Sequence, residues 1–320
     1  MNLHQHTEDF IELVKLSANH FRIATGFIEK DYWITLILCR LSQSANKENA
    51  VFKGGTSLTK GYRLINRFSE DIDLAMINEN LSGNALKTKI RAIEKEITAE
   101  LTEIVEPLIT SKGSMYRKSL FSYPSIVTNI ANTSKRIIVE INAFENPYPF
   151  IKQEITSFIT DYLNVTNQQE AIKTYGLEPF ALNILDKRRT MVEKLVSLLR
   201  FSFAEDVTKA ISSKIRHFYD LYYLANDAEC TEYIQFTDFQ KDLSDLLIHD
   251  QQAFDEPTGW QSKRIADSPL ITDFPSIWKK IRFVYQNELT QLSYGEIPDE
   301  ESVKDSFLNV IQILEEIQYN

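Results

Sequence analysis

The spacing of apolar side chains predicts a chain that begins with helices and continues as a mixed α/β region. Residues 7–43 place apolar side chains three and four positions apart, which is typical of helices with one buried face. A short apolar strand at 50–53 precedes Gly54–Gly55, and a helix is expected over 56–66. The segment "FSEDIDLAM" then alternates as a strand does, whereas 84–106 is rich in strong helix formers.

The pattern changes again in the second half of the chain. "SIVTNIA" and "RIIVEINAF" predict two antiparallel strands joined through the turn-like "NTSK". After "ENPYPF" the pattern is mainly helical, most clearly at 186–201, 212–226 and 302–317, whereas 251–275 is irregular. We therefore expect an α+β fold. An α/β domain with N-terminal helices would span 1–165, and a mostly helical domain would span 166–320.

The composition is that of an ordinary soluble globular protein, with 43% apolar and 25% charged residues. No apolar run approaches the roughly 20 residues of a membrane helix, and the start of the chain does not resemble a signal peptide. Cys39 and Cys230 are the only cysteines, too few for a disulfide framework or a zinc site. These features predict a cytoplasmic protein with no membrane partner.

The net charge of -10 is unevenly distributed. Residues 221–320 contain 19 acidic and 7 basic side chains, so the excess of negative charge lies in the last hundred residues. Because a nucleic-acid footprint is local, the overall charge does not exclude RNA or DNA as a partner.

The adjacent pair Gly54–Gly55 indicates a turn in which the backbone is closely approached. Glycine adopts left-handed conformations and lets a phosphate or another backbone come near. A strand, a glycine turn and a helix start also bring free N–H groups together, and Thr56 and Ser57 would add hydroxyl donors. The segment could therefore hold a triphosphate, or it could be a tight turn capped by Thr56.

Asp71 and Asp73 lie two residues apart on the next predicted strand and therefore share one face, with Cα atoms about 6.5 Å apart. Two carboxylates this close repel each other unless a cation lies between them, and Mg²⁺ suits such a pair together with phosphate oxygens. Glu70 adds a further acid. The alternative is an exposed acidic strand edge, but Ile72 and Leu74 require burial on the opposite face.

Glu140 is a charged residue within an apolar strand. Such a residue costs free energy unless it is paired or bound to a metal. We expect it to be a third metal ligand or a general base, or else to form a salt bridge with Lys135 or Arg136 at a sheet edge.

Two stretches of the helical half carry candidate cations. Lys194 lies beside an apolar stripe in "TMVEKLVSLLR", and Arg216 lies four residues before Asp220 on one helical face. A lysine and an arginine that reach a cleft could neutralise a triphosphate. The alternative for Arg216 and Asp220 is an ordinary ion pair within the helix.

These residues belong to four segments that resemble motifs of the AbiEii/AbiGii toxin family. The segments are "EKDYWITLIL" (29–38), "FKGGTSLTKGYRLINRFSEDIDL" (52–74), "VEKLVSLL" (192–199) and "RHFYDLYYL" (216–224). The family comprises nucleotidyltransferase-like toxins of the DNA polymerase β-type superfamily. The resemblance therefore implies a polymerase β-like core, a small mixed sheet with helices, followed by a mostly helical domain. No motif covers 225–320.

The resemblance also implies roles for individual residues. Asp71 and Asp73 would bind Mg²⁺, with Glu140 as a further metal ligand. The nucleoside triphosphate (NTP) would contact a set formed by Lys53, Gly54, Gly55, Thr56, Ser57, Ser69 and Arg216. Lys194 would contact the triphosphate as well, and Asp220 would orient this lysine or help to deprotonate the acceptor. The fourth family motif usually reads Arg-Asp-x-x-Asp, whereas this chain has histidine at position 217.

The implied activity is transfer of a nucleoside monophosphate from an NTP to an acceptor, with the 3′ end of tRNA as the expected acceptor. Family members are toxins of type IV toxin–antitoxin pairs, often linked to phage defence, so a cognate antitoxin encoded nearby is an expected partner. One alternative is an NTP-binding protein without transferase activity that acts through its antitoxin. Another is an enzyme that nucleotidylates proteins.

Overall fold

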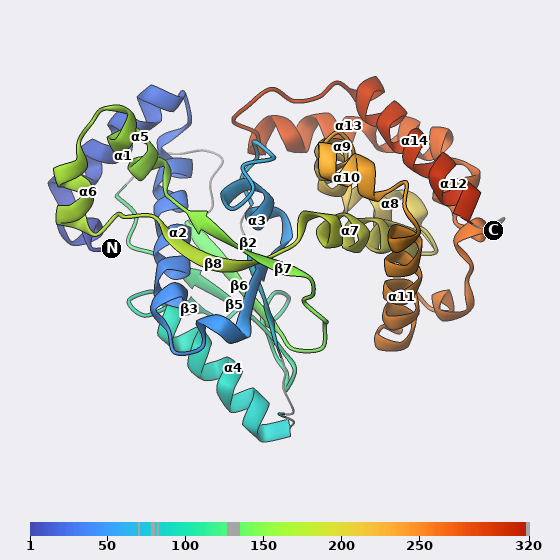
Figure 1. Cartoon of the computed structure of the whole chain (residues 1–320), viewed down its shortest axis with the longest axis horizontal. Coiled ribbons are helices and arrows are strands. Elements are labelled where there is room, and N and C mark those ends of the chain that lie inside the picture. Colours follow the sequence, from blue (N-terminus) through green and yellow to red (C-terminus); the bar gives the residue numbers. More distant parts are fainter. Residues whose placement is uncertain (70, 78–80, 82, 127–134, 318–320) are drawn as a thin grey trace. The chain divides into compact units, whose positions relative to one another are not determined.

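The described residues of the computed structural model are 1–69, 71–77, 81, 83–126 and 135–317, and they divide into two units (Figure 1). The first unit consists of Met1–Arg63 and Phe68–Leu185, and the second of Leu64–Arg67 and Asp186–Asn320. The apolar pattern predicts a boundary after residue 165. The chain changes unit later, because its last strand before Asp186 pairs within the sheet of the first unit.

The N-terminal helices follow the predicted pattern. They are α1 (Thr7–Phe21) and α2 (Thr25–Gln43). The apolar side chains of α1 that recur at helical spacing, including Phe10 and Val14, are buried. α2 differs from an ordinary amphipathic helix because it is buried on nearly all sides, charged residues included. Its charged residues therefore need partners inside the protein.

A mixed eight-stranded sheet forms the centre of the first unit, which confirms the predicted α+β class. Its strands are β1 (Ala50–Lys53), β2 (Asp71–Met76), β3 (Thr102–Ile104), β4 (Ser111–Lys112), β5 (Tyr116–Ser122), β6 (Arg136–Asn142), β7 (Phe150–Ile155) and β8 (Phe180–Leu185). The order is β3–β5–β6–β2–β1–β8–β7, and β4 pairs with β5. β2 runs antiparallel to β1 and parallel to β6, so it lies inside the sheet.

The helices of the first unit differ from the expected boundaries. α3 (Gly54–Lys60) begins at the double glycine and ends six residues before the predicted end. α4 (Gly83–Ile97) also ends early, because the chain after it forms β3 and pairs with β5. Its buried side chains are Leu86, Ile90, Ile93 and Ile97, with Glu94 among them. α5 (Phe158–Val165) and α6 (Gln169–Tyr175) precede β8.

The strand partner expected for β6 is a different segment. Its antiparallel neighbour is β5, and its other neighbour is β2. The predicted partner 125–131 and the predicted turn lie largely outside the described residues. β7 and β8 occupy a region whose pattern predicts helices. A six-residue apolar run such as "FALNIL" does not distinguish a buried strand from a helix segment.

The second unit is helical in its described residues, apart from a single β-bridge between Arg67 and Ser293. Its helices are α7 (Lys187–Phe201), α8 (Val207–Ser212), α9 (Ile215–Ala225), α10 (Ala228–Tyr233), α11 (Thr237–Ala253), α12 (Pro269–Thr272), α13 (Phe274–Leu292) and α14 (Glu300–Ile317). This confirms the three helices expected near 186–201, 212–226 and 302–317. The stretch between α11 and α13 contains only short helical turns, as its prolines indicate.

Among the described helices, none is both long and apolar enough to cross a membrane.

Candidate active site

A row of charged residues crosses four strands of the sheet in the first unit. In the strand register, Lys53 of β1 lies opposite Asp73 of β2, Asp73 lies opposite Glu140 of β6, and Glu140 lies opposite Lys118 of β5. Residues that are opposite in register point to the same face of a sheet. Asp71, two positions before Asp73 on β2, belongs to this face as well.

The carboxylates of this row repel one another. Burial raises the pKa of Asp73, and the nearby charges of Asp71 and Glu140 raise it further, to about 8, although Lys53 acts in the opposite direction. A carboxyl group with so high a pKa is held where a negative charge is unfavourable unless a cation joins it. This face of the sheet therefore has the electrostatic character of a cation site.

Gly54 and Asp73 are in direct contact. Gly54 has φ = 78°, a left-handed conformation that favours glycine. A Cβ atom at this position would lie 2.1 Å from Oδ2 of Asp73 and 3.0 Å from its Cγ. Only glycine therefore allows the Asp73 carboxylate to approach the backbone at the start of α3. The double glycine and the aspartate pair are two parts of one constellation.

The hydroxyl groups of Thr56 and Ser57 hold this turn in place. The Thr56 hydroxyl donates to the backbone carbonyl of Asp71 at 2.5 Å, and the Ser57 hydroxyl donates to the carbonyl of Gly54 at 2.8 Å. Both side chains are buried. The sequence suggested them as donors to phosphates, but each uses its hydroxyl proton within the protein. They fix α3 against β2 instead.

The remaining candidates of the first unit lie near this turn in the chain. Lys53 forms an ion pair with Glu145, and Gly55 is a partly exposed residue of the first turn of α3. Ser69 is also partly exposed and lies two residues before Asp71, outside β2. Glu70 lies outside the described residues.

Glu140 is held by two donors from β5. The Tyr116 hydroxyl donates to Oε2 at 2.8 Å, and Lys118 forms an ion pair with Oε1. The alternative pairing with Lys135 or Arg136 at a sheet edge is wrong, because β6 lies between β2 and β5, and Arg136 pairs with Glu106 instead. Within the described ranges, no group of three metal-binding side chains is close enough to hold an ion.

Asp220 is the centre of a buried charge cluster in the second unit. Its carboxylate accepts two bonds from Arg67 at 2.7 Å each and forms an ion pair with Lys194 at 2.7 Å. Asp220 is 0% exposed. Burial raises its pKa, but the two cations outweigh this effect and hold the pKa well below its usual range. Asp220 therefore stays ionised and fixes the Lys194 amine.

The alternative of an ion pair between Arg216 and Asp220 is wrong, because Arg216 pairs with Glu288 of α13 at 3.0 Å. The partner of Asp220 in its place, Arg67, was not found from the sequence. An arginine between apolar residues in "LINRF" was the available signal, since such a residue needs a buried acid.

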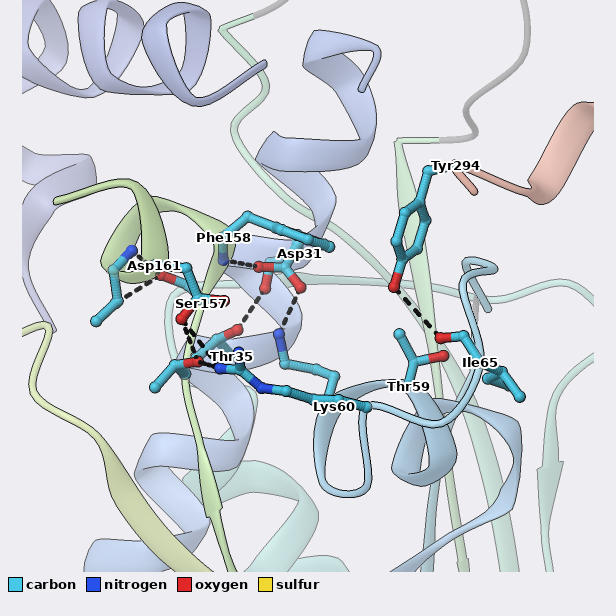
Figure 2. Close-up of polar contacts among 12 residues, drawn as sticks. Asp31, Thr35, Thr59, Lys60, Ile65, Ser157, Phe158, Asp161 and Tyr294 are labelled. Atoms are coloured by element: carbon cyan, nitrogen blue, oxygen red, sulfur yellow. Dashed lines mark hydrogen bonds and ion pairs between the residues drawn. The ribbon is translucent and has the colours of Figure 1, made fainter. Parts of the chain in front are cut away.

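A second buried pair supports α3 from below and was also missed (Figure 2). Lys60, the last residue of α3, forms an ion pair with Asp31 of α2, and Asp31 also accepts the backbone N–H of Phe158 at 2.9 Å. Burial raises the pKa of Asp31, and Lys60 counteracts this shift. The signal in the sequence was three consecutive charged residues, Glu29 to Asp31, within an apolar helix.

Comparisons with known proteins agree with this geometry. The family described as "Nucleotidyl transferase AbiEii toxin, Type IV TA system" matches residues 36–301. Among solved structures, the chain is similar to MenT4, a nucleotidyltransferase toxin from Mycobacterium tuberculosis H37Rv, with a TM-score of 0.50 and 16% sequence identity. That match covers 94% of this chain and 98% of MenT4, and at this identity it shows a shared fold. No curated protein matches the sequence. Because the family match spans most of the chain, the protein belongs to the AbiEii family of nucleotidyl transferase toxins of type IV toxin–antitoxin systems.

Proposed function

We propose that the protein transfers a nucleoside monophosphate from an NTP to the 3′ end of a tRNA and thereby blocks translation. The observation that carries the proposal is the contact between Gly54 and Asp73. It places the turn that would bind phosphates directly against the carboxylate pair that would bind their metal ion. In the reaction, the acceptor hydroxyl oxygen forms a bond to the α-phosphorus, and the bond between this phosphorus and the leaving pyrophosphate breaks.

The donor set of the carboxylate face fits Mg²⁺. Asp71 and Asp73 supply two carboxylates on one face, and this ion takes one or two carboxylates and completes its shell with phosphate oxygens and water. When bound, Mg²⁺ offsets phosphate charge and lowers the pKa of a bound hydroxyl. Glu140 lies opposite Asp73 and would act as a further ligand or accept the proton of the acceptor hydroxyl. Its donors, Tyr116 and Lys118, would hold it in place for either role.

The NTP would be bound by residues of both units. The backbone of Gly54 and Gly55 would contact its phosphates, with Lys53 beside them. Lys194 would offset triphosphate charge, and the buried Asp220 supports this role because it fixes the lysine amine. The side chains of Arg216 and Ser69 are partly exposed and would contribute further contacts.

The biological setting follows from the family. A type IV toxin implies an antitoxin as partner, and we propose that it is encoded nearby and that the pair acts in phage defence in the cytoplasm. Both cysteines are free and buried, which suits a reducing compartment.

Incubation with labelled NTPs, Mg²⁺ and total RNA tests the proposal. We expect a label on tRNA that disappears in the Asp71→Asn and Asp73→Asn variants. Asp245→Asn is the matched control, since Asp245 is an exposed aspartate of α11 outside the site. Labelling that survives the double substitution Asp71→Asn/Asp73→Asn would refute the assigned site. A label on protein instead of RNA would refute the proposed acceptor.

A further inference from the structure

A groove of about 690 Å³ lies beside α4 in the first unit, outside the site described above. Its walls are α4, the segment Thr98–Leu101 that follows it, and residues of β3, β4 and β5. Five of its lining residues are lysine or arginine and three are glutamate. The groove is thus rich in positive charge, although the whole chain carries a net charge of -10.

Three of these cations form a stripe along α4. Lys87, Arg91 and Lys95 are spaced four residues apart, which places them on one face of the helix. All three are exposed and line the groove. Among the described residues, none of the three forms an ion pair. Their charge is therefore available to a ligand.

The carboxylates of the groove are already neutralised. Glu94 pairs with Arg117, Glu103 pairs with Lys112, and Glu100 pairs with an arginine and a histidine from the N-terminal helices. The acids therefore do not offset the stripe on α4, and the groove keeps a positive potential that would attract an anion.

We propose that this groove binds the phosphate backbone of the RNA acceptor, an inference that rests on the proposed function. Lys87 and Lys95 lie eight residues apart, or about 12 Å along the helix axis. One phosphate group cannot contact all three cations, whereas a chain of phosphates can. The groove presents few apolar side chains, with Leu101 partly exposed and Phe121 buried. A protein partner would need an apolar or aromatic anchor, which makes RNA the better fit.

The groove and the carboxylate face lie on opposite sides of the sheet. Arg117 of β5 pairs with Glu94 of α4, whereas the next residue, Lys118, pairs with Glu140 on the other face. Successive side chains of a strand point to opposite faces. An RNA that uses both places must therefore extend around the edge of the sheet. A full-length tRNA is large enough to do so, but a short oligonucleotide that carries only the 3′ end is not.

The test is the triple variant Lys87→Gln/Arg91→Gln/Lys95→Gln, with tRNA binding measured over a range of salt concentrations without NTP. Each lost phosphate contact lowers the slope of log K against log salt by about 0.7–0.9, so we expect the slope to fall by about 2–3. This corresponds to about 50-fold weaker binding at 0.15 M salt, for a contribution that vanishes at 1 M. The apparent KM for full-length tRNA should rise, while transfer to a short 3′-end oligonucleotide should not change.

The matched control is Lys241→Gln/Lys279→Gln/Lys280→Gln, which removes the same charge from exposed lysines of the second unit. An unchanged salt slope in the α4 variant, or an equal loss in the control, would overturn the inference. So would normal tRNA binding together with lost inhibition by the antitoxin, which would assign the groove to an acidic protein. The proposed function fails separately, if the wild-type protein labels no RNA at all, because the binding measurement does not depend on catalysis.

Discussion

The contact between Gly54 and Asp73 makes a sharp prediction for the Gly54→Ala variant. The new methyl group would lie 2.1 Å from Oδ2 of Asp73, although non-bonded carbon and oxygen atoms rarely come closer than 3.0 Å. The carboxylate would therefore have to move by about 1 Å or more, since the alternative is a shift of the backbone at the start of α3. Either movement separates the phosphate turn from the metal-binding pair.

The expected effect has two parts of different size. Alanine in a left-handed conformation costs about 1–2 kcal/mol of folding free energy, and this part applies at any glycine with such a φ. The displacement of Asp73 affects the reaction instead, because a misplacement of about 1 Å at a catalytic group can lower the rate about 100-fold. We therefore expect Gly54→Ala to lower kcat/KM for nucleotide transfer about 100-fold, with a small loss of stability.

Gly259 provides the matched control. It has the same φ of 78°, but a Cβ atom there would meet no other atom within 4 Å. Gly259→Ala should show a similar loss of stability in urea unfolding and normal transfer activity. The reasoning would be refuted if Gly54→Ala kept transfer activity within a few-fold of wild type. It would also be refuted if both variants lost activity equally, because strain would then explain the whole effect.

Three further variants test the buried charges. Asp220→Asn should destabilise by about 3–5 kcal/mol because it leaves Lys194 without its buried partner. The difference in urea stability from wild type should shrink as the pH falls below about 4, since the low folded-state pKa of Asp220 stabilises only the ionised form; a constant difference would contradict this. Asp31→Asn should cost a similar amount, and the double variant Asp31→Leu/Lys60→Met should recover most of it, unless the pair itself is required. Glu140→Gln should lower kcat about 100-fold with an unchanged unfolding midpoint, whereas normal kcat would exclude a role in the reaction.

Local patterns predicted the core of the site because its parts are close in the sequence. Alternation along β2 placed Asp71 and Asp73 on one face, and the order of strand, glycine turn and helix placed Gly54 nearby. The close approach itself could be anticipated from the glycine, since no other residue allows it. Even so, the sequence gave no means to identify Asp73 as the atom group that Gly54 contacts.

The roles of Thr56 and Glu140 depended on tertiary structure and could not be predicted. A hydroxyl beside a glycine turn can donate to a phosphate or to a backbone carbonyl, and only the position of Asp71 decides the outcome. In the same way, the partners of Glu140 depend on strand order. β5 lies beside β6, and the sequence did not identify β5 as a strand.

The segment Leu64–Arg67 explains why the buried cluster around Asp220 matters for a site on another unit. The chain leaves the first unit after Arg63, contributes four residues to the second and returns at Phe68, three residues before Asp71. Within the second unit, Arg67 is fixed by both carboxylate oxygens of Asp220. The backbone of Asn66 accepts the N–H of Tyr294, and further side chains from the second unit bond to this segment. The acidic strand therefore begins directly after a segment that only the folded second unit can order. Asp220, too deeply buried to touch a substrate, would then act on the reaction at two positions, by holding the lysine amine and by fixing the chain that leads into Asp71.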